Sequence, residues 1–191
     1  MFEKSLSSVR RDQPALLALF FDLGDTIMLE ESEVKDATGT TLCAELIPGM
    51  ADALRHLKTQ GHRLALVADA RPQTPVNVLR QHSLFELFEY CAISENLGVE
   101  KPHPRMFQAA SAALGIAPQD YPRVAMIGNN LERDMVGANR LGMISIFYHG
   151  NERRRTHPLT PEEHPRYTVT TPTELIACIA QLAGIPPAAW R

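Results

Sequence analysis

The sequence predicts an α/β fold of three layers, in which a parallel central sheet lies between helices. Short apolar runs alternate with longer amphipathic stretches along most of the chain, as in proteins built from strand-helix-strand units. The first such run, residues 16–21, is continuously apolar, which is typical of a central strand buried on both faces. No segment repeats another, so the pattern favours one doubly covered sheet over a repeat architecture.

The predicted elements follow one another at regular spacing. The helix after Pro48 and Gly49 has apolar residues at helical spacing and Gly61 as its stop, and a later helix ends before Gly115. A turn at 128–130 leads into another helix, which ends near residues 141–142. The remaining strands are expected at 63–68, 90–94, 124–127, 144–148 and 167–170, and further helices at 75–82, 104–114 and 172–183.

Two segments between these elements have a different character. Residues 27–47 are polar and contain a turn-like sequence at 36–39, which predicts a short β-hairpin flap and no large cap domain. Residues 150–166 contain Arg153, Arg154, Arg155 and three prolines, and are predicted to form an exposed loop. Both insertions are too short for a second domain, so residues 1–191 are expected to form a single domain.

The composition excludes several classes of protein. Hydrophobic residues make up 45% and charged residues 21% of the 191 residues, which is a globular composition. A net charge of −3 makes general binding of nucleic acids improbable. The widely spaced Cys43, Cys91 and Cys178 fit neither a disulfide framework nor a zinc site. Residues 1–14 lack a signal-peptide pattern and no apolar run is long enough to span a membrane, so we expect a cytoplasmic location.

Side chains that could take part in catalysis or bind a metal follow the predicted strands. Asp22 ends the first strand, Ala68 and Asp69 end the second, Lys101 lies a short loop after the third, and residues 129–134 follow the fourth. Because the carboxyl ends of parallel strands form the ligand crevice of such a sheet, we expect these residues to converge on one site.

This set of residues suits phosphoryl transfer. A carboxylate such as Asp22 can attack phosphorus, provided that the negative charge of both partners is neutralised. Mg²⁺ binds through one or two carboxylates and keeps several waters, which matches Asp22 together with Asp134. Lys101 would balance the remaining charge on Asp22 and on the phosphoryl group. Taken singly, Lys101 also fits a solvated lysine, and Asp134 fits a surface ion pair with Arg133 or Arg140.

The order and spacing of these motifs resemble those of the haloacid dehalogenase-like superfamily. The resemblance extends from residue 16 to residue 148 and is strongest in LFFDLGDT at 19–26, GVEKP at 98–102 and IGNNLERD at 127–134. It implies that Asp22 is the nucleophile and a metal ligand, and that the Gly24 carbonyl and Asp134 are further ligands. The Asn129 amide would contact the metal weakly or through water, although helix capping explains Asn129 and Asn130 equally well.

The chain departs from the pattern of this family at three positions. Gly24 stands where the family usually has its general acid/base, and Asp25 is expected to point away from the site of reaction. Ala68 replaces a phosphate-binding Ser or Thr, which leaves the backbone N–H groups near Asp69 and Ala70 as candidates for binding an oxyanion. Asn129 replaces an acid, which is expected to weaken metal binding.

The resemblance implies a Mg²⁺-dependent phosphomonoester hydrolase that acts on a phosphorylated substrate of unknown class. Because capless relatives either take bulky substrates or close their sites with a neighbouring subunit, a homo-oligomer is a further expectation. One alternative is a weakly active or inactive relative that binds a phosphorylated ligand or a protein. A phospho-accepting receiver domain is disfavoured, because its acceptor Asp follows a later strand.

Overall fold

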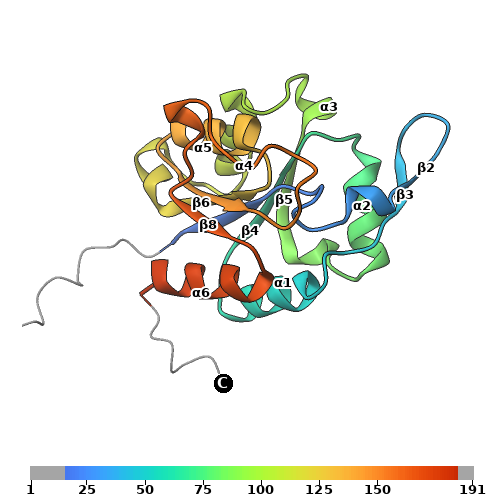
Figure 1. Ribbon diagram of the computed structural model, residues 1–191, viewed down its shortest axis with the longest axis horizontal. Helices are drawn as coiled ribbons and strands as arrows, with labels where there is room; N and C mark the ends of the chain where they lie inside the picture. Colours follow the sequence, from blue (N-terminus) through green and yellow to red (C-terminus); the bar gives the residue numbers. More distant parts are fainter. Residues whose placement is uncertain (1–15, 185–191) are drawn as a thin grey trace, which may run out of the picture.

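A six-stranded parallel sheet forms the centre of the computed structural model, which describes residues 16–184 (Figure 1). The strand order is β5-β4-β1-β6-β7-β8, so β1 pairs with β4 on one side and with β6 on the other. The first strand in the chain is therefore central, and the residue that follows it lies in the middle of the carboxyl edge. The strands are β1 (Ala18–Phe21), β4 (Leu64–Ala68), β5 (Phe88–Ile93), β6 (Val124–Gly128), β7 (Ile144–Tyr148) and β8 (Tyr167–Val169).

Helices cover both faces of this sheet and confirm the predicted three layers (Figure 1). Alternate residues of β1 point to opposite faces, and each face has its own apolar cluster. Leu19 and Phe21 pack in the cluster that includes α1 (Met50–Thr59), α2 (Gln73–Gln81) and α6 (Pro172–Leu182). Ala18 and Phe20 pack in the cluster that includes α4 (Pro104–Ala113) and α5 (Val136–Arg140), and the short α3 (Ser94–Leu97) precedes α4.

The observed elements differ from the predicted ones mainly at their ends. Helix α2 begins two residues before the predicted start at Pro75, because proline in a first helical turn lacks only an N–H that has no partner within the helix. Strand β5 likewise begins at Phe88 rather than at residue 90. A π-helical turn at Leu131–Met135 precedes α5, where the sequence had suggested one continuous helix.

The predicted hairpin is present as β2 (Val34–Lys35) and β3 (Thr41–Cys43), which pair antiparallel. Asp36 fixes the turn, since its Oδ1 accepts hydrogen bonds from the backbone N–H groups of Thr38 and Thr40. The hairpin projects from one end of the molecule beside α2 (Figure 1). It is joined to α2 by the bond from Thr41 N to Thr74 Oγ1, at 3.1 Å.

The segment 150–166 is not simply the exposed loop that the sequence suggested. A 3₁₀ turn at Pro161–Glu163 buries Glu163, whose carboxylate accepts hydrogen bonds from Arg155 Nη1 at 2.5 Å and from Leu159 N at 2.7 Å. These contacts hold the segment in a defined path across the molecule. The sequence around Glu163 is polar, so it gave no indication that this residue would be buried.

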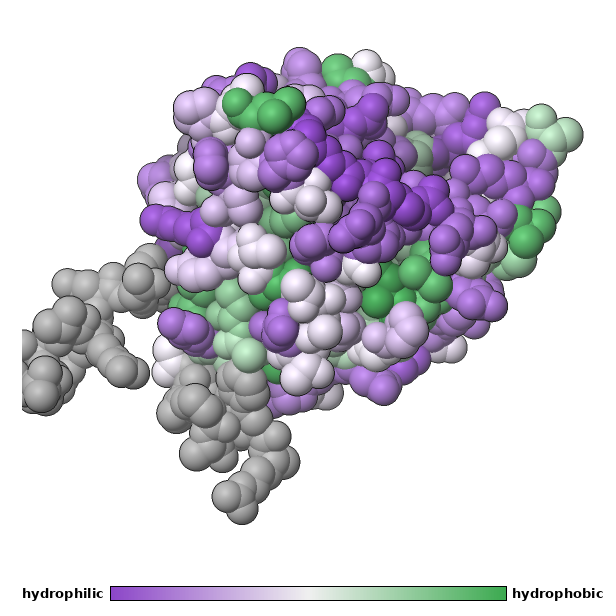
Figure 2. Space-filling model, in the orientation of Figure 1, coloured by the Kyte–Doolittle hydropathy of each residue, from purple (hydrophilic) through white to green (hydrophobic). Residues whose placement is uncertain are grey.

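The surface and the thiols agree with a globular chain. On the face drawn in Figure 2, hydrophilic residues cover most of the surface and hydrophobic residues form small separate areas. Every helix among the described residues is too short or too polar to cross a lipid bilayer. The cysteines are free and partly buried, and burial raises the pKa of the Cys91 and Cys178 thiols to about 11. The predicted lack of a signal peptide concerns residues 1–14, which lie outside the described part.

The Glu163 carboxylate gives a testable pH dependence of stability. The hydrogen bond from Arg155 lowers the pKa of Glu163 from 4.5 to about 2. The contribution of Glu163 to the free energy of unfolding is therefore fully present above pH 4.5 and is lost as the pH falls toward 2. We expect Glu163→Gln to lower the melting temperature at neutral pH and to approach the wild type in acid, as measured by circular dichroism. The exposed neighbour Glu152, changed to Gln, serves as control; a pH-independent deficit in Glu163→Gln would contradict this linkage.

Candidate active site

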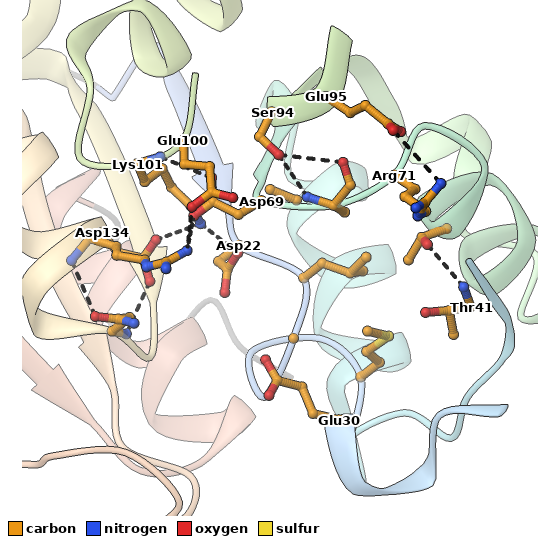
Figure 3. A pocket seen from close by; sticks show the side chains of 18 of the residues that line it. Asp22, Glu30, Thr41, Asp69, Arg71, Ser94, Glu95, Glu100, Lys101 and Asp134 are labelled. Carbon is orange, nitrogen blue, oxygen red and sulfur yellow. Dashed lines mark hydrogen bonds and ion pairs between the residues drawn. The ribbon is translucent and has the colours of Figure 1, made fainter. Parts of the chain in front are cut away.

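The residues predicted to carry chemistry meet in one pocket at the carboxyl edge of the sheet, with a volume of about 900 Å³ (Figure 3). Asp22 follows β1, Asp69 follows β4, and Asn129 and Asp134 follow β6. Lys101 comes from the loop between α3 and α4. The hairpin forms another side of this pocket through residues that include Glu33 and Thr41. Because the strands are buried on both faces, they fix the backbone positions from which most of these side chains enter the pocket.

Lys101 links two carboxylates at the bottom of this pocket. Its Nζ lies 2.5 Å from Asp22 Oδ1 and 2.7 Å from Asp134 Oδ1. Lys101 is 4% exposed and Asp134 is fully buried, so Lys101 and Asp134 are not the surface ions that each suggests when taken singly. Burial acts to lower the pKa of Lys101, but the charges of Asp134, Asp22 and then Asp69 outweigh it and raise that pKa above its ordinary value. Lys101 therefore stays a cation beside Asp22.

Asp134 is held by its own loop as well as by Lys101. Its Oδ2 accepts the Asn130 N–H at 3.0 Å, and Asn130 Oδ1 in turn accepts from Glu132 N and Arg133 N. Asn130 thus caps the π-helical turn. Burial raises the pKa of Asp134, with Lys101 acting in the opposite direction. A Cβ on Gly128 would lie only 2.3 Å from Asp134 Oδ2, so this approach requires glycine.

Asn129 behaves differently from Asn130. It is 5% exposed, and neither Oδ1 nor Nδ2 has a hydrogen-bond partner among the described residues. A buried amide without partners is costly, and such a group commonly serves a ligand, an ion or a water. Capping therefore explains Asn130 but not Asn129.

The oxygen donors fit a magnesium ion better than a transition metal. No cluster of three or more His, Cys, Asp or Glu residues suited to a metal occurs among residues 16–184. The pocket instead offers the carboxylates of Asp22 and Asp134, the Asn129 amide and the backbone of Gly24. Mg²⁺ prefers such oxygen ligands and completes its shell with water, so a donor set with few carboxylates suits this ion.

Asp69 and Ala68 have roles that the sequence described only in part. Asp69 Oδ1 accepts the Lys101 N–H at 2.9 Å, and Oδ2 pairs with Arg133 at 2.9 Å, so Asp69 orients the loop that carries Lys101. Ala68 is buried and offers no hydroxyl. The Ala70 N–H, a candidate for binding an oxyanion, instead donates to Ser94 Oγ at 3.1 Å.

Asp25 points away from the pocket, as expected. It is 1% exposed, has a left-handed backbone φ of 48°, and accepts the Glu30 N–H through Oδ1 at 3.0 Å. Its Oδ2 lies 3.2 Å from Arg153 Nε. Asp25 therefore ties the loop after β1 to the distant segment 150–166.

Glu30 and Arg133 also line the pocket, although the sequence assigned neither of them to the site, and Arg154, whose arginine run could contact an anionic substrate or partner, lines it too. Arg154 comes from the supposed exposed loop, and its Nη2 pairs with Glu30 Oε1 at 2.7 Å. For Arg133, the sequence suggested only an ion pair with Asp134. The run of three arginines was the one feature of the sequence that could have indicated Arg154. Nothing in the residues around this run indicates that it lies beside the pocket.

Comparison with known proteins shows the family of this chain. A family model described as haloacid dehalogenase-like hydrolase matches residues 14–142. The chain belongs to this family. A glyceraldehyde 3-phosphate phosphatase of Methanopyrus kandleri is 28% identical over 136 residues, which cover 71% of this chain and 57% of the relative. A phosphoserine phosphatase of Thermus thermophilus is 31% identical over 120 residues, covering 63% of this chain and 45% of the relative.

Solved structures show the same family fold. A HAD phosphatase from Thermococcus onnurineus superposes with a TM-score of 0.70 at 17% identity, covering 86% of this chain and 98% of that one. The matched part of the chain covers 57% of the first of these relatives and 45% of the second, so both relatives are considerably longer. Membership of the family and its fold are thus shown, while the activity of those longer proteins does not transfer directly.

Removal of Lys101 tests the electrostatics of this site. We expect Lys101→Met to lower the free energy of unfolding by about 3–5 kcal/mol without divalent ions, because the buried Asp134 and the largely buried Asp22 lose the cation between them. Denaturant unfolding measures this loss. The control is Lys58→Met, whose pair with Glu89 lies at the surface and is expected to contribute about 1 kcal/mol or less. Equal losses in the two variants would contradict the assignment.

Proposed function

We propose that this protein hydrolyses phosphate monoesters in a Mg²⁺-dependent reaction, through an aspartyl-phosphate on Asp22. The observation that carries the proposal is the contact of Asp22 with the buried cation Lys101 inside an open pocket. A carboxylate with a fixed cation beside it can approach a phosphoryl group with less repulsion. The phosphatases named among the relatives support the same reaction class.

In the proposed reaction, an oxygen of Asp22 attacks phosphorus as the bond to the leaving oxygen breaks. Lys101 stays bound to the Asp22 carboxylate, orients it, and balances charge on the phosphoryl oxygens. Asp22, Asp134, the Gly24 carbonyl and Asn129 would hold Mg²⁺, which supplies further neutralisation of phosphoryl charge when bound. Water then attacks the phosphorus of the acyl phosphate and releases Asp22 with inorganic phosphate.

The substrate is a phosphorylated compound that reaches an open pocket. The hairpin forms one side of this pocket but does not seal it, which leaves room for a bulky phosphoester or for closure by a second copy of the chain. Free thiols fit the proposed cytoplasmic location. The competing hypothesis, a binding module without turnover, draws on Gly24 and Ala68, which provide neither an acid nor a hydroxyl.

Turnover separates these two hypotheses. We expect the purified protein to hydrolyse 4-nitrophenyl phosphate and members of a panel of metabolite phosphates with Mg²⁺, and Asp22→Asn to lose at least about 10³-fold in kcat, since the nucleophile is gone. Phosphate release measures both. Equal and negligible rates in the two proteins with every metal would favour the binding module.

Binding of Mg²⁺ tests the role of Asn129 without relying on activity. We expect Asn129→Asp to bind Mg²⁺ roughly tenfold more tightly, because it adds a negative charge where a buried amide lacks partners. Isothermal titration calorimetry measures the affinity. Asn130→Asp is the matched control, because Asn130 Oδ1 is directed to backbone N–H groups of the π-helical turn. Comparable gains in both variants would argue against a ligand role for Asn129.

A further inference from the structure

Hydrolysis of a phosphoester on Asp22 requires a group that handles protons. The leaving oxygen needs a proton as its bond to phosphorus breaks, and the attacking water must lose one. Asp22 is occupied as the nucleophile in this scheme, and Lys101 is held as a cation between two carboxylates. The loop directly after Asp22 offers only Gly24 and an Asp25 that is turned away. Another pocket residue must therefore carry the proton.

Glu30 occupies the space that a side chain at position 24 would fill. A Cβ built on Gly24 would lie 2.3 Å from Glu30 Oε1 and 2.9 Å from its Cδ. The Glu30 carboxylate thus lies where a side chain at position 24, two residues after Asp22, would lie. Figure 3 shows the carboxylate end of Glu30 directed toward the part of the pocket that holds Asp22.

Contacts on several sides hold Glu30 in this position. Its backbone N–H donates to Asp25 Oδ1, and its carboxylate pairs with Arg154 at 2.7 Å and with Arg153 at 3.6 Å. The Glu30 side chain is 24% exposed, so it faces the pocket without being fully solvated. A carboxylate held against position 24 and facing the pocket can exchange a proton with a water or with a leaving oxygen there.

The carboxylates of Asp134 and Asp69 hold Lys101 in place, which Glu30 does not. Asp134 is fully buried under Lys101, and Asp69 is bonded to the Lys101 N–H and to Arg133. Glu100 pairs with Arg133 and is 62% exposed. Neither Asp134 nor Asp69 is free to take up a proton without breaking the contacts that orient Lys101.

The outer carboxylates lie on the far walls of the pocket. Glu33 is on the hairpin side, where it pairs with Lys35 and accepts the Thr41 hydroxyl. Glu95 faces Arg71 at 3.8 Å and is about half exposed, and Figure 3 shows Glu95 away from Asp22. Glu30 is therefore the pocket carboxylate best placed to serve the reaction at Asp22.

We propose that Glu30 is the general acid/base of this site and reaches, from a different turn of the chain, the space left by Gly24. This inference rests on the proposed phosphatase function. In the second half-reaction a water proton moves to Glu30 while the water oxygen bonds to phosphorus and the Asp22–phosphorus bond breaks. In the next turnover that proton passes from Glu30 to the leaving oxygen as the ester bond breaks, so protons balance over one cycle.

The first test compares leaving groups. With Glu30→Gln we expect kcat/KM for alkyl phosphates to fall by about 10²- to 10⁴-fold, and the pre-steady-state release of 4-nitrophenolate to lose less, because a good leaving group needs no proton. An acid-quenched reaction with a ³²P-labelled aryl phosphate should then show label accumulating on the protein, since water attack is slowed. Glu31→Gln is the matched control, because Glu31 is exposed in the same 3₁₀ turn.

The second test moves the carboxylate back to position 24. The double variant Gly24→Asp/Glu30→Ala should recover at least about tenfold in alkyl phosphate turnover over Glu30→Ala, because the new side chain enters the vacated space. Gly24→Asp alone should be impaired, since the two carboxylates collide. Circular dichroism of each variant separates loss of folding from loss of chemistry.

The outcomes distinguish this inference from the function on which it rests. Wild-type turnover that depends on Asp22, combined with an equal effect of Glu30→Gln on all leaving groups and no recovery in the double variant, would overturn the role of Glu30 alone. Absence of turnover in the wild type would overturn both proposals. A selective loss with recovery would establish Glu30 as the proton carrier.

Discussion

The ion triad of Lys101, Asp22 and Asp134 is the interaction on which the site depends. Asp22 directly follows β1, and Asp134 lies in the π-helical turn after the neighbouring β6. Their carboxylates repel each other where water is excluded, and the cation between them makes the arrangement stable. The same cation orients the Asp22 carboxylate, as a nucleophile requires. Structural stability and proposed reactivity thus use one contact, and a bound divalent ion would share the charge of the same two carboxylates.

Close backbone approach makes this triad possible. Gly128 allows Asp134 to fold back against the end of β6, and Asp69 fixes the loop of Lys101 through its backbone N–H. Strands β1 and β6, which precede Asp22 and Asp134 in the chain, are buried on both faces and so provide rigid starting points. The pocket is therefore preorganised at its base, while its walls come from the hairpin and from the segment 150–166.

Arginine contacts from the segment 150–166 extend the site beyond the family motifs. Arg153 reaches Asp25 and Arg154 reaches Glu30, so two residues near β1 are fixed by a segment more than a hundred positions away. The Arg154–Glu30 pair is partly exposed and contributes little stability by itself, whereas the Asp25 carboxylate of the other pair is buried. Together they set the direction of the Glu30 carboxylate, which relates a surface segment to the chemistry proposed for the pocket.

The sequence by itself determined the layers of the fold and the position of Asp22, because burial on two faces leaves a continuous apolar strand that can be read locally. It also indicated that Lys101 and Asp134 lie near Asp22, since parallel strands end at one edge. The observed ends of some elements differ from the predicted ones by a residue or two, as at the start of the helix predicted from Pro75. Only the tertiary structure decided that Glu30 fills the space beside Gly24 and that Arg154 holds it, because contacts between side chains distant in sequence leave no local pattern.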